Sequence, residues 1–348
     1  MIFKQKMISE VEDVHIGPLQ LTSGEVLDDI TLRYERVGPR NAPVILACHA
    51  LTGNHLTVGT EEQLGWWSGL ISEKNYIDTQ KFQIITFNVL GGCDGSTGPL
   101  SINPKTQSVY RASFPDISIR DMVNAQYLAL KKLNIDKLHT IIGGSLGGMQ
   151  VFEWGLCYPE VTEKLIMLAT TPVFSDYGIA FNHIAKTVIK NDPNWNGGFY
   201  ETHDNITGLE VARMIGMITY RSSDLFSQRF NRSRTDTEFD VTSYLNYQGQ
   251  KLKKRFDANS YLYLLDAMNQ HDIGREYGSW QQACEKLSMP ILMLSFDKDL
   301  IYEPKQMNTC AEYLPNGDYR HIKTDFGHDG FLVEFDKWGP LIKTFLNK

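Results

Sequence analysis

Four glycines surround one serine in the stretch LHTIIGGSLGGMQVFEWG, residues 138–155. Within it, Gly143 to Gly147 match the pattern G-x-S-x-G, with Ser145 at the centre. An apolar run precedes this pattern and a helical pattern follows it, which is the context of a nucleophile elbow. Small residues two positions before and after the serine allow the strand and the helix to approach each other while the hydroxyl stays accessible. We therefore predict that Ser145 is a nucleophile.

A glycine-rich phosphate-binding loop is the alternative interpretation of the same stretch. A Walker A loop would continue with Gly-Lys and then Ser or Thr, and a dinucleotide-binding turn would carry G-x-G-x-x-G. Neither pattern occurs around Ser145. The nucleophile interpretation is therefore favoured.

A serine hydroxyl is a weak nucleophile until a base takes its proton and a carboxylate orients that base. His328, in TDFGHDGFLVEF, follows the last strand-like segment and precedes a C-terminal helical pattern, so we predict that it is the base. Two carboxylates, Asp297 and Asp299, follow a strand-like run that ends at Phe296. Either aspartate could orient His328, and the pattern alone does not separate them.

Acyl transfer also needs two backbone N–H groups aimed at the oxyanion of the tetrahedral intermediate. Leu146 directly follows the nucleophile at the start of the helix, so we predict that it supplies one of them. Leu51, in the loop CHALTGN after the first buried strand-like run, is the predicted second donor. His49 and His55 flank this loop but precede the serine in the chain, so we predict that they are structural or line the pocket.

Five short apolar runs alternate with helical patterns and are typical of buried parallel strands. They are VILACHA (44–50), FQIITFNV (82–89), HTIIGG (139–144), LIMLATT (165–171) and PILMLSF (290–296). The segment SIRDMVNAQYLALKKLNI carries apolar residues at helical spacing, which predicts an amphipathic helix on a sheet. This alternation predicts an α/β fold with a doubly wound, mostly parallel sheet.

The alternation stops for more than a hundred residues of helical, aromatic-rich sequence between Thr171 and Pro290. We predict that residues 174–287 form an inserted helical lid. Residues 1–173 and 288–348 then form the α/β core.

Composition narrows the classes of partner. The formal net charge of −7 over 348 residues argues against general nucleic-acid binding. The chain has no apolar run of about 18 residues and no secretory pattern at its start, so we expect a cytoplasmic protein that does not bind membranes. Its five cysteines are scattered without a C-x-x-C pair, so we expect free thiols and no metal site.

Seven motifs, in order along nearly the whole chain, resemble the homoserine O-acyltransferase family of the α/β-hydrolase superfamily. They are CHALTGN (48–54), NVLGGCDGSTGP (88–99), FPDISIRDMVNAQ (114–126), GGSLGGMQ (143–150), ARMIGMITYRS (212–222), RFDANSYLYL (255–264) and GHDGFL (327–332). The resemblance implies an α/β-hydrolase fold and ping-pong transfer of an acetyl group from acetyl-CoA to L-homoserine, as in methionine biosynthesis. It also implies no permanently bound cofactor, and a homodimer formed through the lid.

The resemblance implies roles for individual residues as well. It supports Ser145 and His328 as nucleophile and base, with Leu51 and Leu146 as the oxyanion hole. The run DLIYEP is similar to the family's Asp-x-Leu-Phe-x-Pro pattern, which selects Asp299 over Asp297. Asp329 would bind the amino group of homoserine, and Arg213 its carboxylate.

The lid motif ARMIGMITYRS supports an acid-binding surface by its spacing. Arg213, Gly216, Met217 and Tyr220 share one face of a helix, so a cation and a phenol are presented together. From spacing alone, pairing of Arg213 with a lid carboxylate is an equal alternative. The chain departs from the family at Met217, where a histidine is common, and also at Leu100 and Arg111.

Several questions stay open at the level of sequence. The donor could be acetyl- or succinyl-CoA and the acceptor homoserine or serine, because a few pocket side chains decide both. A carboxylesterase would use the same catalytic groups, and a binding protein with an inactive site is a further alternative. The arginines of RFNRSR (Arg229, Arg232 and Arg234) could meet coenzyme A phosphates, although a solvated basic face is favoured.

Overall fold

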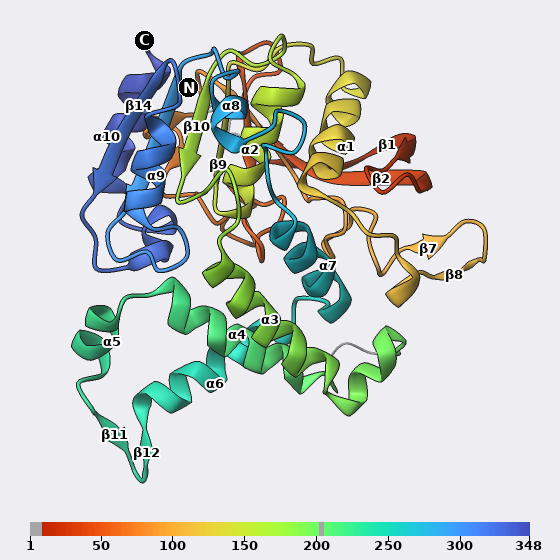
Figure 1. The fold of residues 1–348 in the computed structure, drawn as a ribbon, viewed down its shortest axis with the longest axis vertical. Coiled ribbons are helices and arrows are strands. Elements are labelled where there is room, and N and C mark those ends of the chain that lie inside the picture. Colours follow the sequence, from red (N-terminus) through yellow and green to blue (C-terminus); the bar gives the residue numbers. More distant parts are fainter. Residues whose placement is uncertain (1–8, 202–204) are drawn as a thin grey trace, which may run out of the picture.

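The computed structural model of the chain describes residues 9–201 and 205–348. Its centre is an eight-stranded sheet in the order β1-β2-β6-β3-β9-β10-β13-β14 (Figure 1). These strands are β1 (Glu10–Gln20), β2 (Val26–Val37), β3 (Val44–Cys48), β6 (Gln83–Phe87), β9 (Thr140–Gly144), β10 (Leu165–Leu168), β13 (Ile291–Phe296) and β14 (Gly317–Ile322). From β6 to β14 the neighbouring strands are parallel, whereas β1 and β2 add an antiparallel edge. The sheet grows outward from β3 in both directions, which confirms the predicted doubly wound α/β fold.

All five predicted strands are present, each shorter than predicted by at least one residue. Strands β1, β2 and β14 were not predicted from the sequence. Their residues alternate between buried and exposed or lie half exposed at the sheet edges, so they do not form the continuous apolar runs that mark buried strands.

The two faces of the sheet have separate apolar cores, because successive side chains of a strand point to opposite sides. On β3, Leu46 packs into one core and Ile45 into the other. The first core includes side chains of α1 (Ile119–Lys132) and α2 (Leu146–Cys157). The second includes side chains of the C-terminal helix α10 (Phe335–Leu346). Helices thus cover both faces and hold the carboxyl ends of the strands in place.

The remaining elements belong to loops, to the lid and to the C-terminal part of the chain. The helices are α3 (Asp176–Lys190), α4 (Thr207–Tyr220), α5 (Ser223–Phe230), α6 (Asp240–Lys253), α7 (Ala258–Asn269), α8 (Trp280–Cys284) and α9 (Pro304–Ala311). The short strands are β4 (Ile71–Ser72), β5 (Ile77–Asp78), β7 (Ile102–Asn103), β8 (Ser108–Val109), β11 (Arg234–Thr235) and β12 (Glu238–Phe239). The 3-10 helices are Arg111–Ser113, Pro193–Gly198 and Gly327–Leu332.

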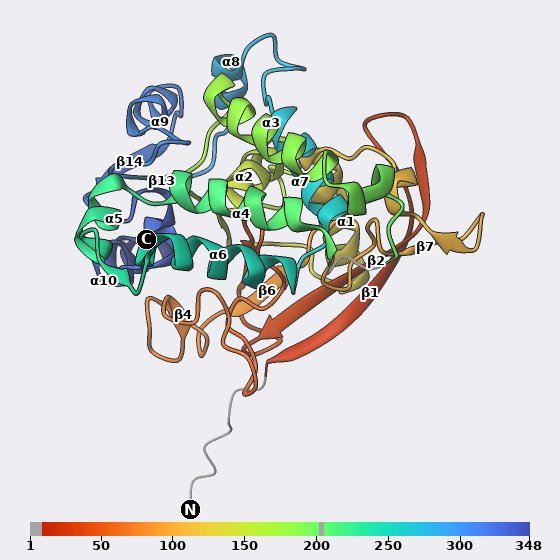
Figure 2. The same ribbon diagram turned by 90° about the horizontal axis from the view of Figure 1, so that it is seen from below.

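The lid helices extend away from the sheet, on the side where Figure 1 shows the hairpin β11–β12 at their far end. Seen from below, α4 lies between α3 and α6 (Figure 2), and it contacts both helices. The chain enters and leaves the lid through two segments that lie side by side. Val173 forms an antiparallel bridge with Asp272, and the N–H of Phe174 donates to the C=O of His271 over 3.0 Å. These paired segments form the neck of the lid.

Helix α8 follows the neck and lies against α9. The Sγ atoms of Cys284 on α8 and Cys310 on α9 are 3.7 Å apart, and both side chains are buried. We propose that the lid ends at the neck, near Asp272, and that α8 belongs to the core, although the sequence pattern predicts a boundary at Leu287.

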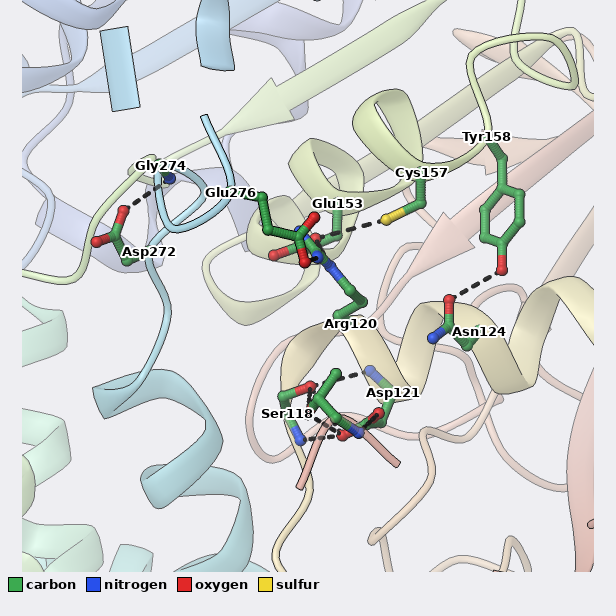
Figure 3. Close-up of polar contacts among 11 residues, drawn as sticks. Ser118, Arg120, Asp121, Asn124, Glu153, Cys157, Tyr158, Asp272, Gly274 and Glu276 are labelled. Carbon is green, nitrogen blue, oxygen red and sulfur yellow. Dashed lines mark hydrogen bonds and ion pairs between the residues drawn. The ribbon is translucent and has the colours of Figure 1, made fainter. Parts of the chain in front are cut away.

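An ion network links α2, the helix that follows Ser145, to the neck (Figure 3). Arg120 on α1 donates from Nε to Glu153 on α2 over 2.9 Å, and its Nη1 lies 2.5 Å from Glu276, which follows the neck. Burial raises the pKa of the Glu153 carboxyl, and the charge of Arg120 opposes that shift. Cys157, one turn along α2, donates to the same carboxylate. The network fixes α2, and therefore the residue that precedes it, relative to the base of the lid.

No helix within residues 9–201 and 205–348 has the length and apolar character needed to cross a membrane. Over the same ranges, no group of three or more His, Cys, Asp or Glu side chains is arranged as a metal site. All five cysteines are free thiols.

Candidate active site

Ser145 occupies the sharp turn between β9 and α2. Its backbone lies at φ 58° and ψ −126°, a conformation that non-glycine residues rarely adopt. A Cβ on Gly147 would lie 2.1 Å from the C=O oxygen of Cys48, and one on Gly143 would lie 2.4 Å from the C=O oxygen of Gly147. Both glycines therefore provide the close approach of strand and helix that the G-x-S-x-G pattern predicts.

His328 lies in the 3-10 helix Gly327–Leu332, against a carboxylate from the loop after β13. Its Nδ1 donates to Oδ2 of Asp299 over 2.8 Å, and the Asp299 side chain is fully buried. The other oxygen of Asp299 accepts the N–H groups of Ile301 and Tyr302 at 2.9 and 3.0 Å. This geometry fixes the orientation of the imidazole and leaves Nε2 as its proton acceptor.

Asp297 points elsewhere. Its side chain is 43% exposed and lies 3.5 Å from His321. The structure therefore brings Asp299, and not Asp297, to His328.

Ser145 and His328 line one pocket, together with Leu51. The Ser145 hydroxyl donates to the hydroxyl of Tyr302 over a long 3.5 Å, and in the described part of the chain it makes no hydrogen bond to His328. Such nucleophile–base hydrogen bonds are often absent without ligand and form in the substrate complex. Tyr302 was not among the predicted site residues, although it stands at the Phe position of the Asp-x-Leu-Phe-x-Pro pattern.

The backbone N–H groups of Leu51 and Leu146 have no acceptor among the described residues. Leu146 is the first residue of α2, where a helix leaves its N–H groups unpaired. Leu51 is buried and lies beside Ser145 in two pockets. Both donors are therefore available to an oxygen bound near Ser145.

His49 holds the loop that presents Leu51. Its Nδ1 donates to the C=O of Ala50 over 2.8 Å, and its Nε2 accepts the N–H of Val89 over 3.0 Å. Burial lowers the pKa of His49 to about 4, so the ring is neutral and can both donate and accept. His49 has the structural role that its position before the serine predicts.

The pocket around Ser145 also collects the polar residues predicted for the acceptor. It has a volume of about 60 Å³. Its lining residues are Ala50, Leu51, Thr52, Ser145, Arg213, Tyr220, His328, Asp329, Phe331 and Leu332. The guanidinium of Arg213 lies over the ring of Tyr220, 5.7 Å from its centroid. No carboxylate in the described part of the chain forms an ion pair with Arg213. The alternative that Arg213 pairs with a lid carboxylate is therefore not observed among these residues.

Asp329 has a partner that the sequence analysis missed. Its Oδ2 accepts a hydrogen bond from Nε of Arg221 over 3.0 Å. The only sequence signal was the position of Arg221, directly after Tyr220 in the lid motif. The C-terminal helix α10 begins only at Phe335, so Asp329 does not cap it.

A second, more apolar pocket lies on the lid side of Ser145. It is narrow, about 30 Å³. Its lining includes Phe174, Phe181, Ala185, Ala212, Ile215, Met268 and three tyrosines, Tyr220, Tyr261 and Tyr302. Burial raises the pKa of all three phenols, so they are neutral. Ser145 therefore stands between a polar pocket and an aromatic one.

A family model described as alpha/beta hydrolase fold matches residues 43–335. Homoserine O-acetyltransferase from Carboxydothermus hydrogenoformans is 40% identical over 361 aligned residues, which cover 97% of this chain and 95% of that protein. The chain belongs to the homoserine O-acetyltransferase family.

Solved structures agree with membership of the homoserine O-acetyltransferase family. The Bacillus anthracis homoserine O-acetyltransferase matches with a TM-score of 0.92 at 25% identity, covering 98% of both chains. Esterase E22 matches with a TM-score of 0.89 at 24% identity, over 97% of this chain and all of that one. At this identity the esterase shows a shared fold alone, so the same scaffold carries more than one named activity.

Tyr302 and Met217 are two of the positions at which this chain departs from the pattern of the homoserine O-acetyltransferase family. Tyr302 adds a hydroxyl beside Ser145 where the family pattern has Phe. Met217 stands where a histidine is common, and its side chain is buried in the lid.

Proposed function

We propose that the protein transfers an acetyl group from acetyl-CoA to the side-chain hydroxyl of L-homoserine through an acyl-Ser145 intermediate. The main observation behind the proposal is one pocket that holds Ser145 and His328 together with a carboxylate, Asp329, and a cation, Arg213, which has no ion-pair partner among the described residues. An amino acid needs a cation for its carboxylate and an anion for its ammonium group. Membership of the homoserine O-acetyltransferase family supports the choice of acceptor.

In the first half-reaction, His328 takes the proton of Ser145, and the serine oxygen attacks the thioester carbon. Asp299 stabilises the imidazolium that forms. The N–H groups of Leu51 and Leu146 receive the oxyanion. His328 then protonates the departing thiolate, and coenzyme A leaves an acetyl ester on Ser145.

In the second half-reaction the acceptor takes the place of coenzyme A. With its carboxylate at Arg213 and its ammonium at Asp329, homoserine would place its hydroxyl near His328. The base removes that proton, the acceptor oxygen attacks the ester, and Ser145 leaves with the proton from His328. Ser145 and His328 are only 6% and 4% exposed, which limits competition from water.

Three alternatives share most of these features. A succinyl donor or a serine acceptor would use the same chemistry, and the narrow aromatic pocket beside Ser145 favours the smaller acetyl group. A carboxylesterase would use the same triad on the scaffold that esterase E22 shares. A binding protein with an inactive site would not react with a serine-directed fluorophosphonate, which labels activated serines.

A matrix of donors and acceptors tests the proposal directly. Thiol release is followed with acetyl-CoA or succinyl-CoA as donor and with L-homoserine, L-serine or water as acceptor. We expect the acetyl-CoA and L-homoserine pair to be fastest, with parallel double-reciprocal lines because the acyl-serine separates the half-reactions. Hydrolysis as fast as transfer would support the esterase, and intersecting lines would contradict the covalent intermediate.

The homodimer through the lid is part of the proposal. Tyr177 and Ile184, seven positions apart on α3, are 52% and 47% exposed. Val211 and Ile218, also seven apart on α4, are 40% and 53% exposed. Apolar residues at this spacing suit helix–helix packing between two lids. Ile184→Glu with Ile218→Glu should turn a dimer into a monomer in analytical ultracentrifugation.

The cytoplasmic location stays a prediction.

A further inference from the structure

A small basic pocket lies beside the catalytic pocket, at the C-terminal end of α6. It has a volume of about 90 Å³. Its lining residues are Arg213, Gln248, Lys251, Leu252 and Arg255. Arg213 comes from α4, and the other two cations lie at or just after the end of α6. Three of its five lining residues are cations, and none is a carboxylate, although the chain carries a net charge of −7.

The three cations have no ion-pair partner within residues 9–201 and 205–348. Lys253, also near the end of α6, differs because it forms an ion pair with Glu210. Arg255 donates from Nη1 to the neutral C=O of Thr52 over 2.9 Å, and no carboxylate lines the pocket itself. Partial desolvation and the neighbouring charge of Arg213 lower the pKa of Arg255, and Asp94 opposes that shift. An anion bound in the pocket would relieve the repulsion between the two guanidinium groups.

The basic pocket adjoins the catalytic pocket. Arg213 lines both pockets, and Thr52, whose carbonyl accepts from Arg255, lines the catalytic one with Ser145. A ligand that occupied both pockets would have one end at Ser145 and the other at Lys251 and Arg255, with Arg213 between them. The donor in the proposed reaction has this shape, with a reactive thioester at the end of a flexible arm and phosphate groups at the other end.

We propose that the pocket of Lys251 and Arg255 binds the phosphate groups of the acyl donor's nucleotide end. The inference rests on the proposed function and adds to it the contacts that select a coenzyme A thioester over other acyl donors. Guanidinium and ammonium groups form charge-assisted hydrogen bonds with phosphate oxygens. Arg213 stands between the two pockets and can serve the carboxylate of the acceptor after coenzyme A has left.

The arginines of RFNRSR are the competing phosphate site. Arg232 and Arg234 lie at the hairpin β11–β12 at the far end of the lid (Figure 1), 5.6 and 4.0 Å from the ring centroid of Phe239, whereas Arg229 lies on α5. Arg229 lies 4.5 Å from the ring centroid of Tyr244. Their guanidinium groups already pack on aromatic rings, and none lines the two pockets beside Arg213.

The test compares acetyl-CoA with S-acetylpantetheine, which has the same thioester and arm but no phosphate. The quantity measured is the ratio of kcat/KM for the two donors, from thiol release at saturating L-homoserine. We expect the intact protein to prefer acetyl-CoA and Lys251→Glu to lower the ratio about tenfold or more, the loss expected for a charged hydrogen bond. Arg255→Gln can still donate to Thr52 and should lower the ratio in the same direction.

Two control variants test whether a change in the ratio is specific to the basic pocket. Lys190→Glu changes the charge of an exposed residue at the end of α3 and should leave the ratio as it is. Arg232→Glu tests the competing site at the hairpin. If Arg232→Glu lowers the ratio of kcat/KM and Lys251→Glu does not, the phosphate groups bind at the hairpin. That result would overturn the inference.

The remaining outcomes separate the inference from the proposed function. If the intact protein uses both donors equally well, or if Lys251→Glu slows both donors to the same extent, the phosphate site is wrong while acetyl transfer stands. If the intact protein releases no thiol from acetyl-CoA but hydrolyses p-nitrophenyl acetate, the proposed function itself fails.

Discussion

The hydroxyl of Ser145 donates to the hydroxyl of Tyr302 across 3.5 Å, while the base His328 is held on its far side by Asp299. Tyr302 is 1% exposed, and its hydroxyl has no other hydrogen-bond partner among the described residues. Its ring centroid lies 5.1 Å from that of His328. In the resting site, the nucleophile is therefore bound to a phenol and not to the base that must activate it.

Tyr302→Phe removes this competing acceptor. We expect kcat/KM for the acyl donor to rise about two- to tenfold, because a neutral hydrogen bond contributes about 0.5–1.5 kcal/mol and Ser145 would be free to bond His328. The measurement is single-turnover thiol release without acceptor. A fall in that rate would mean that the Tyr302 hydroxyl assists the chemistry, and no change would mean that its contact with Ser145 is without consequence.

Asp299→Asn tests the orientation of the base. Asn can still accept the N–H groups of Ile301 and Tyr302, but it removes the negative charge beside His328 and allows the wrong tautomer. We expect kcat to fall by about four orders of magnitude with little change in donor binding. Asp297→Asn is the matched control, and it should be mild because that side chain is 43% exposed and lies against His321, not His328. The opposite ranking of the two variants would contradict the assignment of the triad.

The two aspartates also show where sequence reasoning stops. The nucleophile could be predicted because the elbow is local: a strand, a glycine-flanked serine and a helix are all visible within one stretch. Asp297 and Asp299 both follow β13 within three positions, and only the folded loop decides which one reaches His328. Pairing of Arg221 with Asp329 joins residues 108 positions apart, so no local pattern could indicate it.

The edges of the fold were missed for a related reason. Strands β1 and β2 carry charged residues on their exposed faces, for example Asp13 and Arg33, which form an ion pair across the ladder. A search for apolar runs finds the buried centre of a sheet and overlooks such half-exposed strands. The centre, which carries Ser145 and the loop of Asp299, was the part that the sequence could predict.

Asp329→Asn separates acceptor recognition from acylation. If Asp329 holds the ammonium of homoserine, the variant should lose about 2–5 kcal/mol of transition-state stabilisation, measured as a lower kcat/KM for homoserine. Single-turnover acylation should be unchanged. Because Asp329 also accepts from Arg221, the variant Arg221→Gln is measured beside it. Equal losses in both variants, or a fall in acylation, would show that Asp329 acts by holding the lid and not by binding the acceptor. Asp325→Asn, at an exposed carboxylate paired with Lys298, is the control expected to leave both rates intact.

Buried neutral histidines predict how stability depends on pH. Burial lowers the pKa of His49 to about 4 and that of His271 to about 3, against an ordinary value of 6.5. Below pH 6.5 both histidines are protonated in the unfolded chain but stay neutral in the folded chain. The free energy of unfolding should therefore fall as the pH drops toward 4. Each histidine contributes up to about 1.4 kcal/mol per pH unit, and neither contributes above about pH 7.5.

Denaturant unfolding at a series of pH values measures this slope. His271→Gln should flatten the slope by about one proton between pH 4 and 6, whereas His183→Gln, at an exposed site, should not. An unchanged slope in His271→Gln would mean that His271 is not the group that resists protonation.

The central claim is that Ser145 carries the acyl group between donor and acceptor. Rapid acid quenching after mixing with acetyl-CoA alone, followed by intact mass spectrometry and peptide mapping, measures this directly. The account predicts one acetyl group on the peptide of Ser145, none in Ser145→Ala, and its loss on adding L-homoserine with an equal amount of O-acetyl-L-homoserine formed. Product formation by the intact protein without any acetyl ester on Ser145 at any quench time would contradict it.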